Sequence, residues 1–181
     1  MTKGAFLDRD GVLNANVKIG EKIGPPRFVS EVELLPGVTE AIDLLHRNNY
    51  LPIVVTNQPD VARGTQSLSQ VGSINSYIGE KTGILHFYVC PHDNLDQCQC
   101  RKPKPGLIEI ATKELEIDLN HSFLVGDRWK DIEAGQAVSL PSFFIDNLYP
   151  ELNPVPPFTR VSSLLEAVRI RVGESDASRV E

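Results

Sequence analysis

Five short apolar segments, each ending at polar or turn residues, constrain the fold of this chain more than any other feature. They occupy residues 5–7, 51–56, 84–89, 122–125 and 142–145. Runs of this length are typical of buried β-strands. Helical periodicity alternates with them, in residues 38–45, 66–80, 107–115, 129–138 and 162–170. The alternation predicts an α/β fold, a three-layer doubly wound parallel sheet with helices on both faces.

Length and charge limit the number of domains and the kinds of binding partner. The 181 residues suffice for one domain with a substantial core, which we expect to span residues 1–172. Residues 173–181 lack an apolar face, so we expect a flexible tail there. The 18 lysines and arginines against 24 aspartates and glutamates give a net charge of −6, which disfavours nucleic acids and anionic membranes as partners.

The sequence shows no sign of a targeting or membrane-spanning segment. Its beginning reaches Asp8 before any apolar core of signal-peptide length, and no apolar run approaches the roughly 18 residues of a membrane span. The glycine-rich motifs that bind nucleotide phosphates are also missing. We therefore expect a soluble, cytoplasmic monomer without a nucleotide cofactor.

Polar residues at the ends of the predicted strands are the candidates for a functional site. Ligands of doubly wound sheets bind outside the carboxyl ends of the strands. Because parallel strands bring these ends to one edge, side chains far apart in the sequence are expected to meet there. The candidates are Asp8, Asp10, Thr56, Asn57, Cys90, His92, Asp127 and Asp131.

Two carboxylates, Asp8 and Asp10, follow the first predicted strand and precede Gly11. Carboxylates two residues apart in an extended segment can point to the same side. A cation relieves their repulsion, and oxygen ligands of this kind favour Mg²⁺. Considered alone, the segment is equally consistent with a solvated turn rich in Asp and Gly.

Other strand ends supply the remaining groups that phosphoryl transfer needs. Thr56 offers a hydroxyl, and Arg101 and Lys102 offer cations. Asp127 and Asp131 offer further carboxylates. A carboxylate nucleophile needs a metal, cations that hold the phosphate oxygens, and an acid for the leaving group. Taken singly these residues are more often caps or solvated groups, but their shared position at strand ends favours catalysis.

These motifs, in this order, resemble those of the haloacid dehalogenase superfamily of phosphatases over about residues 6–145. The matching segments are Asp8-x-Asp10-Gly11, Thr56-Asn57, Lys102 and Gly126-Asp127-x-x-x-Asp131. The resemblance implies a Rossmann-like core. It also implies that Asp8 is the nucleophile that forms an aspartyl-phosphate, and that Asp10 protonates the leaving alkoxide and later activates water. Mg²⁺ would be held by Asp127, the Asp8 carboxylate and the Asp10 backbone carbonyl.

Thr56, Lys102 and Asp131 complete the site that the resemblance implies. The first two would stabilise the transferring phosphoryl group, and Asp131 would orient the metal ligands from behind. Capped members of the superfamily insert a sizeable domain after the first or second motif, but the segments here are too short, so we expect no cap domain. Specificity would then come from loops at residues 14–27, 58–66 and 90–101.

A second cluster of metal-binding residue types lies in the segment 90–100. Its ligand set would be Cys90, His92, Cys98 and Cys100. Three thiols and an imidazole at this spacing predict tetrahedral Zn²⁺ rather than free buried thiols. Because the protein would fill all four positions, the zinc would be structural, stiffening the loop that presents Arg101 and Lys102.

The zinc loop narrows the resemblance to the branch that includes heptose 1,7-bisphosphate 7-phosphatases and histidinol-phosphate phosphatases. Segments 61–64 and 101–106 lean toward the heptose enzymes, whereas the short zinc loop is also like that of the histidinol enzymes. The leading hypothesis is Mg²⁺-dependent removal of the C7 phosphate during nucleotide-activated heptose biosynthesis. Histidinol phosphate hydrolysis and a catalytically silent, zinc-stiffened phosphate-binding module are the alternatives. The substrate would be contacted by Asn57, Arg63, Arg101 and Arg128.

Overall fold

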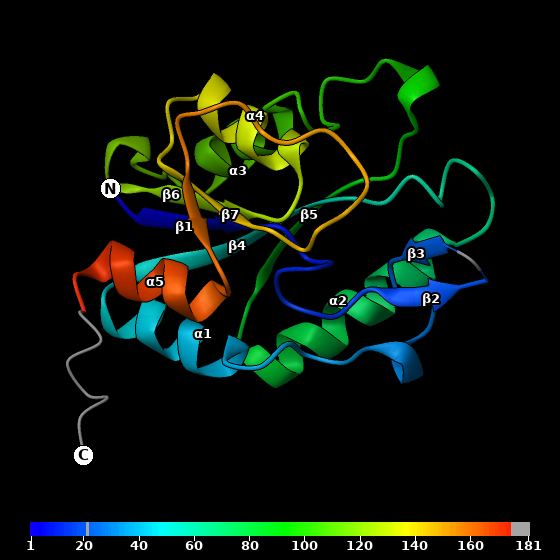
Figure 1. Ribbon diagram of the computed structural model, residues 1–181, viewed down its shortest axis with the longest axis horizontal. Helices are drawn as coiled ribbons and strands as arrows, with labels where there is room; N and C mark the ends of the chain where they lie inside the picture. The colour runs from blue at the N-terminus through cyan, green and yellow to red at the C-terminus, as the bar shows by residue number, and fades with distance from the viewer. Residues whose placement is uncertain (21, 175–181) are drawn as a thin grey trace.

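The computed structural model describes residues 1–20 and 22–174 and has the expected three-layer α/β architecture. Its centre is a six-stranded parallel sheet in the order β5-β4-β1-β6-β7-β8 (Figure 1). The strands are β1 (Lys3–Leu7), β4 (Tyr50–Asn57), β5 (His86–Cys90), β6 (Phe123–Gly126), β7 (Ser142–Ile145) and β8 (Thr159–Val161). The five predicted strands are therefore all present in one sheet.

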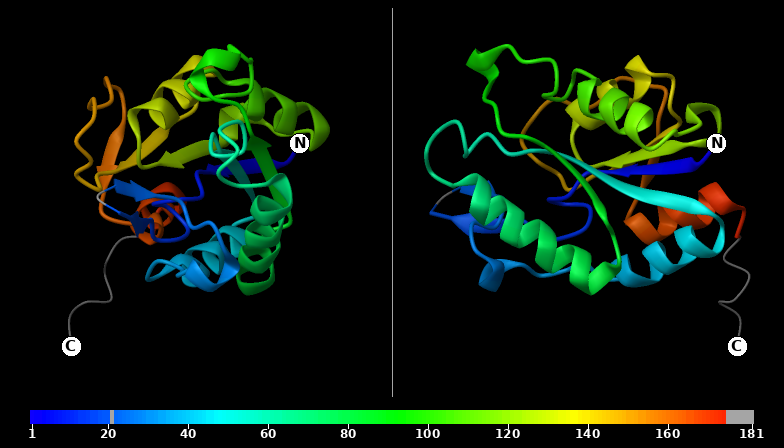
Figure 2. Two further views of the ribbon diagram at one scale, coloured as in Figure 1. Left: turned by 90° about the vertical axis from the view of Figure 1, so that its right-hand side faces the viewer. Right: turned by 180° about the vertical axis from the view of Figure 1, so that it is seen from behind.

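In the described part of the chain, five α-helices cover the two faces of the sheet. Figures 1 and 2 show that they form two layers, one on each face. The first group is α1 (Val38–Arg47), α2 (Leu68–Thr82) and α5 (Leu164–Val172), and the second is α3 (Gly106–Glu114) and α4 (Trp129–Ala137). Short 3-10 turns are η1 (Val29–Glu31), η2 (Asn94–Asp96) and η3 (Leu119–His121). All five helical segments inferred from periodicity are thus confirmed.

Each face of the sheet has its own apolar core. In β1, Ala5 and Leu7 pack into the core with α1, α2 and α5, whereas Phe6 packs into the core with α3 and α4. Successive side chains of a strand point to opposite faces, so a strand covered on both sides must be apolar throughout. This explains why the inner strands appear in the sequence as continuous apolar runs.

The order of the strands creates a crevice beside β1. The chain runs from β1 to β4 and β5 on one side, then returns to place β6, β7 and β8 on the other side. Connections then leave β1 and β6 in opposite directions, and such a switch point opens a crevice at their carboxyl ends. Asp8 follows β1 and Asp127 follows β6, so the fold brings both to this crevice.

Three features differ from the sequence-based expectations. Residues 14–27, expected to form a loop, contain an antiparallel hairpin of β2 (Val17–Ile19) and β3 (Lys22–Gly24). Strand β8 was not expected either. Strands of three residues are too short to give a readable alternation. Strand β5, expected to be buried, is mostly half-buried because it is an edge strand with one neighbour.

The segments between the motifs hold no inserted domain among the described residues. Between Asp10 and Thr56 lie the hairpin, η1 and α1, and between Thr56 and Lys102 lie α2, β5 and η2. Within the described ranges no helix has the length and apolar character of a membrane span. Of the expected tail, Gly173 ends α5 in a left-handed cap, and residues 175–181 lie outside the described residues.

Candidate active site

The crevice beside β1 holds a buried cluster of three carboxylates and one ammonium group. Lys102 Nζ lies 2.8 Å from Asp8 Oδ1 and 2.5 Å from Asp131 Oδ1. It also donates to the backbone oxygen of Val55 at 2.7 Å. An ammonium group has three protons to donate, so these three acceptors satisfy it fully. Four residues predicted separately from three motifs, Asp8, Lys102, Asp127 and Asp131, are thus brought together.

The charges in this cluster do not balance. Burial raises the pKa of Asp8 to about 6, with Asp131 and Asp10 adding to the shift and Lys102 opposing it. Although burial disfavours its charge, the carboxylates of Asp131 and Asp8 raise the pKa of Lys102. One lysine therefore compensates only part of the negative charge, and the cluster favours an additional cation.

Asp127 completes the carboxylate cluster with one oxygen free. It is 1% exposed, and its Oδ1 has no hydrogen-bond partner among the described residues. Burial and the charges of Asp8 and Asp131 raise the pKa of Asp127 well above its usual value. A buried carboxylate oxygen without a donor is costly unless it binds a cation. Asp8, Asp127 and Asp131 offer oxygens within 4.8 Å of one another, a donor set that fits Mg²⁺.

Two glycines give the carboxylates their space. Gly11 has φ +91°, and a Cβ there would lie 1.9 Å from Asp127 Oδ2. A Cβ on Gly126 would lie 2.1 Å from the Cβ of Asp131. Any larger residue at either position would displace a carboxylate, so both glycines are required by close approach, and Gly11 also by its left-handed backbone conformation.

Asp10 is bound by its own set of hydrogen-bond donors. Arg9, which is fully buried, donates to it through Nε and through Nη2 at 2.9 Å. Gln58 Nε2 donates to Asp10 Oδ2 at 2.7 Å, and Asn14 Nδ2 donates to Oδ1 at 3.0 Å. Gln58 Nε2 also donates to the Thr56 hydroxyl at 2.9 Å. Arg9, Asn14 and Gln58 were not singled out from the sequence, although Arg9 and Gln58 adjoin motif residues and Asn14 lies three residues after Gly11.

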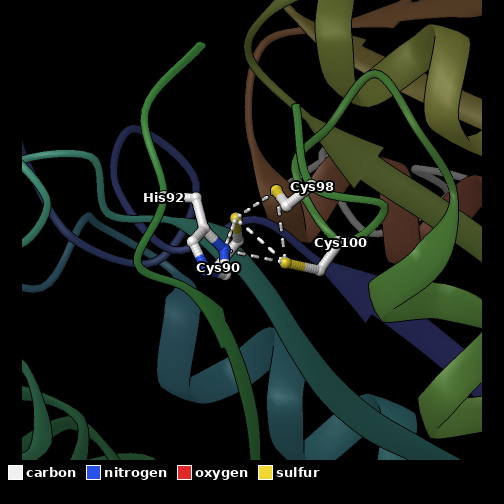
Figure 3. A group of neighbouring side chains, drawn as sticks. All are labelled: Cys90, His92, Cys98 and Cys100. Atoms are coloured by element: carbon white, nitrogen blue, oxygen red, sulfur yellow. Dashed lines mark hydrogen bonds between the residues drawn. The ribbon is translucent and has the colours of Figure 1, made fainter. Parts of the chain in front are cut away.

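The four predicted zinc ligands form a second compact cluster (Figure 3). The Cys100 sulfur lies 3.2 Å from the Cys90 sulfur and 3.5 Å from the Cys98 sulfur. His92 Nδ1 lies 3.3 Å from the Cys100 sulfur and 3.6 Å from the Cys90 sulfur. Zn–S bonds of about 2.3 Å in a tetrahedron separate sulfurs by roughly 3.8 Å. The observed separations are slightly shorter, so the four groups can bind Zn²⁺ after small outward shifts.

The thiol and carboxylate clusters are joined through the chain segment after Cys100. Arg101 donates from Nη1 to the backbone oxygen of His92 at 3.0 Å, and from Nε to the side chain of Asn94 at 2.9 Å. Asn57 makes two hydrogen bonds to the backbone of Lys102. Its side chain accepts from the Lys102 N–H and donates to the Lys102 carbonyl, both at 3.1 Å. The position of Lys102 therefore depends on β4 on one side and on the thiol loop on the other.

A cleft of about 360 Å³ opens above the carboxylate cluster. The predicted substrate residues Asn57, Arg63, Arg101 and Arg128 all line it, as do Asp8, Asp10, Thr56, Lys102 and Asp131. Asn16 and Arg27, both within the loop 14–27 that was expected to contribute specificity, also line it, as does Lys130, which was not singled out from the sequence. The cleft thus has carboxylates at its base and mostly cations at its mouth, an arrangement suited to a small anionic ligand.

Comparison with solved structures supports the fold. The structure of a D,D-heptose 1,7-bisphosphate phosphatase from B. bronchiseptica, complexed with magnesium and phosphate, superposes with a TM-score of 0.82 at 23% identity, covering 96% of this chain and 100% of that one. A putative HAD-like phosphatase from Mesorhizobium loti gives a TM-score of 0.74 at 28% identity, covering 98% of this chain and 90% of that one.

Sequence comparison identifies the family. A D-glycero-alpha-D-manno-heptose-1,7-bisphosphate 7-phosphatase of Photorhabdus laumondii is 38% identical, covering 79% of this chain and 81% of that protein. The beta-anomer enzyme of Pasteurella multocida is 35% identical, covering 77% and 79%. The family model for haloacid dehalogenase-like hydrolases matches residues 4–139. With this match and relatives at these identities, the chain belongs to the haloacid dehalogenase-like hydrolases.

Proposed function

We propose that the protein is a Mg²⁺-dependent phosphatase that removes the C7 phosphate of D-glycero-D-manno-heptose 1,7-bisphosphate through an aspartyl-phosphate. The observation that carries the chemistry is the buried cluster in which Lys102 bridges Asp8 and Asp131 beside the unpartnered Oδ1 of Asp127. The substrate is inferred from the relatives, which include enzymes named for this sugar in both anomeric forms.

Asp8 is the nucleophile in this proposal. Its Oδ1 is bound to Lys102, which leaves the other carboxylate oxygen to attack phosphorus. Asp8, Asp127 and the Asp10 backbone carbonyl would hold Mg²⁺, with Asp131 behind them. When bound, the ion would offset the repulsion between the carboxylates and the phosphate dianion. Lys102 would add a second positive charge beside the transferring group.

Asp10 acts as the general acid and then as the general base. Arg9, Gln58 and Asn14 fix both of its oxygens, so the carboxyl group is oriented before the substrate binds. It would donate a proton to the leaving alkoxide and later remove one from the water that hydrolyses the aspartyl-phosphate. Thr56, tied to Gln58, would donate its hydroxyl to the phosphoryl oxygens.

The cations at the mouth of the cleft bind the second phosphate of the substrate. Arg63, Arg101 and Arg128 line the cleft above the carboxylates, and a bisphosphate offers an anionic group at each end. Asn57 also lines it and keeps Lys102 in place. The zinc held by the loop 90–100 would be structural. We further propose that residues 1–172 form the catalytic domain and act as a cytoplasmic monomer.

Parallel assays of phosphate release test this function. Heptose 1,7-bisphosphate and histidinol phosphate are supplied separately with Mg²⁺, and we expect turnover of the first to exceed that of the second by at least about 100-fold, or about 2.7 kcal/mol in transition-state binding. Preference for histidinol phosphate would reject the sugar assignment. Turnover of neither substrate, with phosphate still bound, would indicate a silent phosphate-binding module.

A further inference from the structure

A loop outside all four motifs reaches the carboxylate of Asp127. It connects β7 to β8, and from it Asn147 Nδ2 donates to Asp127 Oδ2 and to the backbone oxygen of Gly11, both at 3.1 Å. The hydroxyl of Tyr149, in the same loop, also hydrogen-bonds to the Asp127 side chain. Asn16 Nδ2 donates to that hydroxyl at 2.6 Å. Three segments distant in sequence therefore meet at one phenol group.

The two oxygens of Asp127 have different environments. Oδ2 is engaged by the loop, whereas Oδ1 is buried without a partner among the described residues. A Cβ at Gly11 would lie 1.9 Å from Asp127 Oδ2 and 2.9 Å from the Tyr149 hydroxyl, so the packing around both atoms is tight. A carboxylate anchored at one oxygen cannot rotate freely, so its other oxygen would stay available to a cation bound among Asp8, Asp127 and Asp131.

The ring of Tyr149 makes a different contact. The guanidinium of Arg128 lies 4.4 Å from the ring centroid, within cation–π range. Arg128 also pairs with Glu151 of the same loop at 2.8 Å and lines the mouth of the cleft. The ring therefore limits where the guanidinium can point, and with it one of the cations available to the remote phosphate.

We propose that Tyr149 is a positioning residue with two points of action. Its hydroxyl fixes Asp127 so that Oδ1 faces Mg²⁺, and its ring fixes Arg128 for the second anionic group of the substrate. The inference rests on the proposed function, because that function gives Asp127 and Arg128 their ligands. It adds the β7–β8 loop to the catalytic machinery.

Magnesium binding to the substrate-free protein tests the hydroxyl. Tyr149→Phe keeps the ring and removes one hydrogen bond to a charged group, so calorimetric titration should show an approximately tenfold higher dissociation constant for Mg²⁺. At saturating Mg²⁺, the ratio of kcat/KM for heptose 1,7-bisphosphate to that for heptose 7-phosphate should stay within about twofold of the parent. Unchanged magnesium affinity would overturn the proposal.

Two further variants control for a global effect and for misfolding of Tyr149→Phe. Tyr88→Phe removes a phenol that donates to Glu114 at 2.8 Å, away from the cleft, and should leave magnesium affinity unchanged. If it weakened binding as much as Tyr149→Phe, the effect would be global and the proposal would fail. Asn147→Ala removes the amide that donates to Asp127 Oδ2 and should also weaken Mg²⁺ binding, so the idea stays testable if Tyr149→Phe does not fold.

Tyr149→Leu tests the ring. It should bind Mg²⁺ like Tyr149→Phe, but the bisphosphate-to-monophosphate ratio of kcat/KM should fall by about fivefold relative to the Phe variant, as expected for one lost cation–π contact. Equal ratios in the two variants would overturn the assignment of the ring to Arg128. Failure of the proposed function would instead appear as absent turnover in the parent protein, which the magnesium titrations do not depend on.

Discussion

Two clusters of metal-binding side chains lie at the same edge of the sheet but are built differently. Asp8 and Asp127 directly follow the central strands β1 and β6, and with Asp131 they are almost fully buried around Lys102. The thiol cluster follows the edge strand β5 and is carried by a loop, and only Cys90 of its cysteines is fully buried. The sheet positions the first cluster, whereas the second is positioned by a loop and by the ion it would hold.

The two clusters affect the free energy of unfolding in opposite ways. Three buried carboxylates around one lysine repel one another, so they should lower the free energy of unfolding until a divalent cation binds. A loop whose ligands close on zinc gains stability from the metal, because the unfolded chain has no preformed site. The comparison predicts that removing a carboxylate destroys activity and can stabilise the protein, whereas removing a thiol destabilises it.

The largest expected effect is that of Asp8→Asn on turnover. An amide cannot form the aspartyl-phosphate, so kcat for heptose 1,7-bisphosphate should fall by about 10⁴-fold or more. Circular dichroism should remain that of the parent. Asp43→Asn, on the exposed side of α1, is the matched control and should retain full activity. Residual turnover above about 10% in Asp8→Asn would contradict the nucleophile assignment.

Cys98→Ser should produce the largest loss of stability. The parent should contain about one equivalent of zinc and the variant almost none, by metal analysis. A ligand at 1,000 times its dissociation constant contributes about 4 kcal/mol, and we expect a loss of about this size in urea unfolding. Leu95→Ser, an exposed position in the same loop, should change neither quantity. Full stability without zinc would show that the loop needs no metal.

Asp8→Asn should have the opposite effect on stability. Burial raises the pKa of Asp8 to about 6 in the folded protein, against 3.8 for an unperturbed aspartate side chain, so the folded state binds this proton more tightly. Without added Mg²⁺, its contribution to the free energy of unfolding must then fall as pH rises from about 4 to 6. The shift corresponds to about 3 kcal/mol.

Urea unfolding should show that Asp8→Asn is more stable than the parent by up to that amount at pH 7, and that the two are similarly stable at pH 4. A parent as stable as the variant at pH 7 would contradict this expectation.

The sheet and the motif residues could be predicted because the sequence encodes them locally. A strand covered on both faces is a continuous apolar run, and the polar residues at its end are candidate site residues, so Asp8, Thr56 and Asp127 could be found without a structure. The thiols could be found because Cys98 and Cys100 lie close in sequence to Cys90 and His92. In each case the signal and the function lie within a few residues of each other.

The missed residues act across large distances in the sequence. Tyr149 and Asn147 reach Asp127 from the loop that begins at the carboxyl end of β7, and only the fold shows that these two side chains turn toward β6. Arg27 belongs to the loop 14–27 that was expected to contribute specificity, but only the fold shows that this residue, in the segment after the hairpin, lines the cleft. Arg9 was overlooked for a different reason, since a charged residue between two motif aspartates is expected to be solvated, yet its pairing with Asp10 allows full burial.

The smallest expected effect on kcat is that of Asn57→Ala. This substitution tests whether the sheet or the thiol loop positions Lys102. The substitution removes two hydrogen bonds to the Lys102 backbone, together contributing about 2 kcal/mol, but Lys102 Nζ keeps its three acceptors. We therefore expect kcat to fall by only about tenfold, with zinc content unchanged. Asn120→Ala, at an exposed turn, is the control. If Asn57→Ala reduced kcat more than Cys98→Ser does, the lysine would be held by the sheet rather than by the thiol loop, because the zinc-free variant still has its Asn57 contacts.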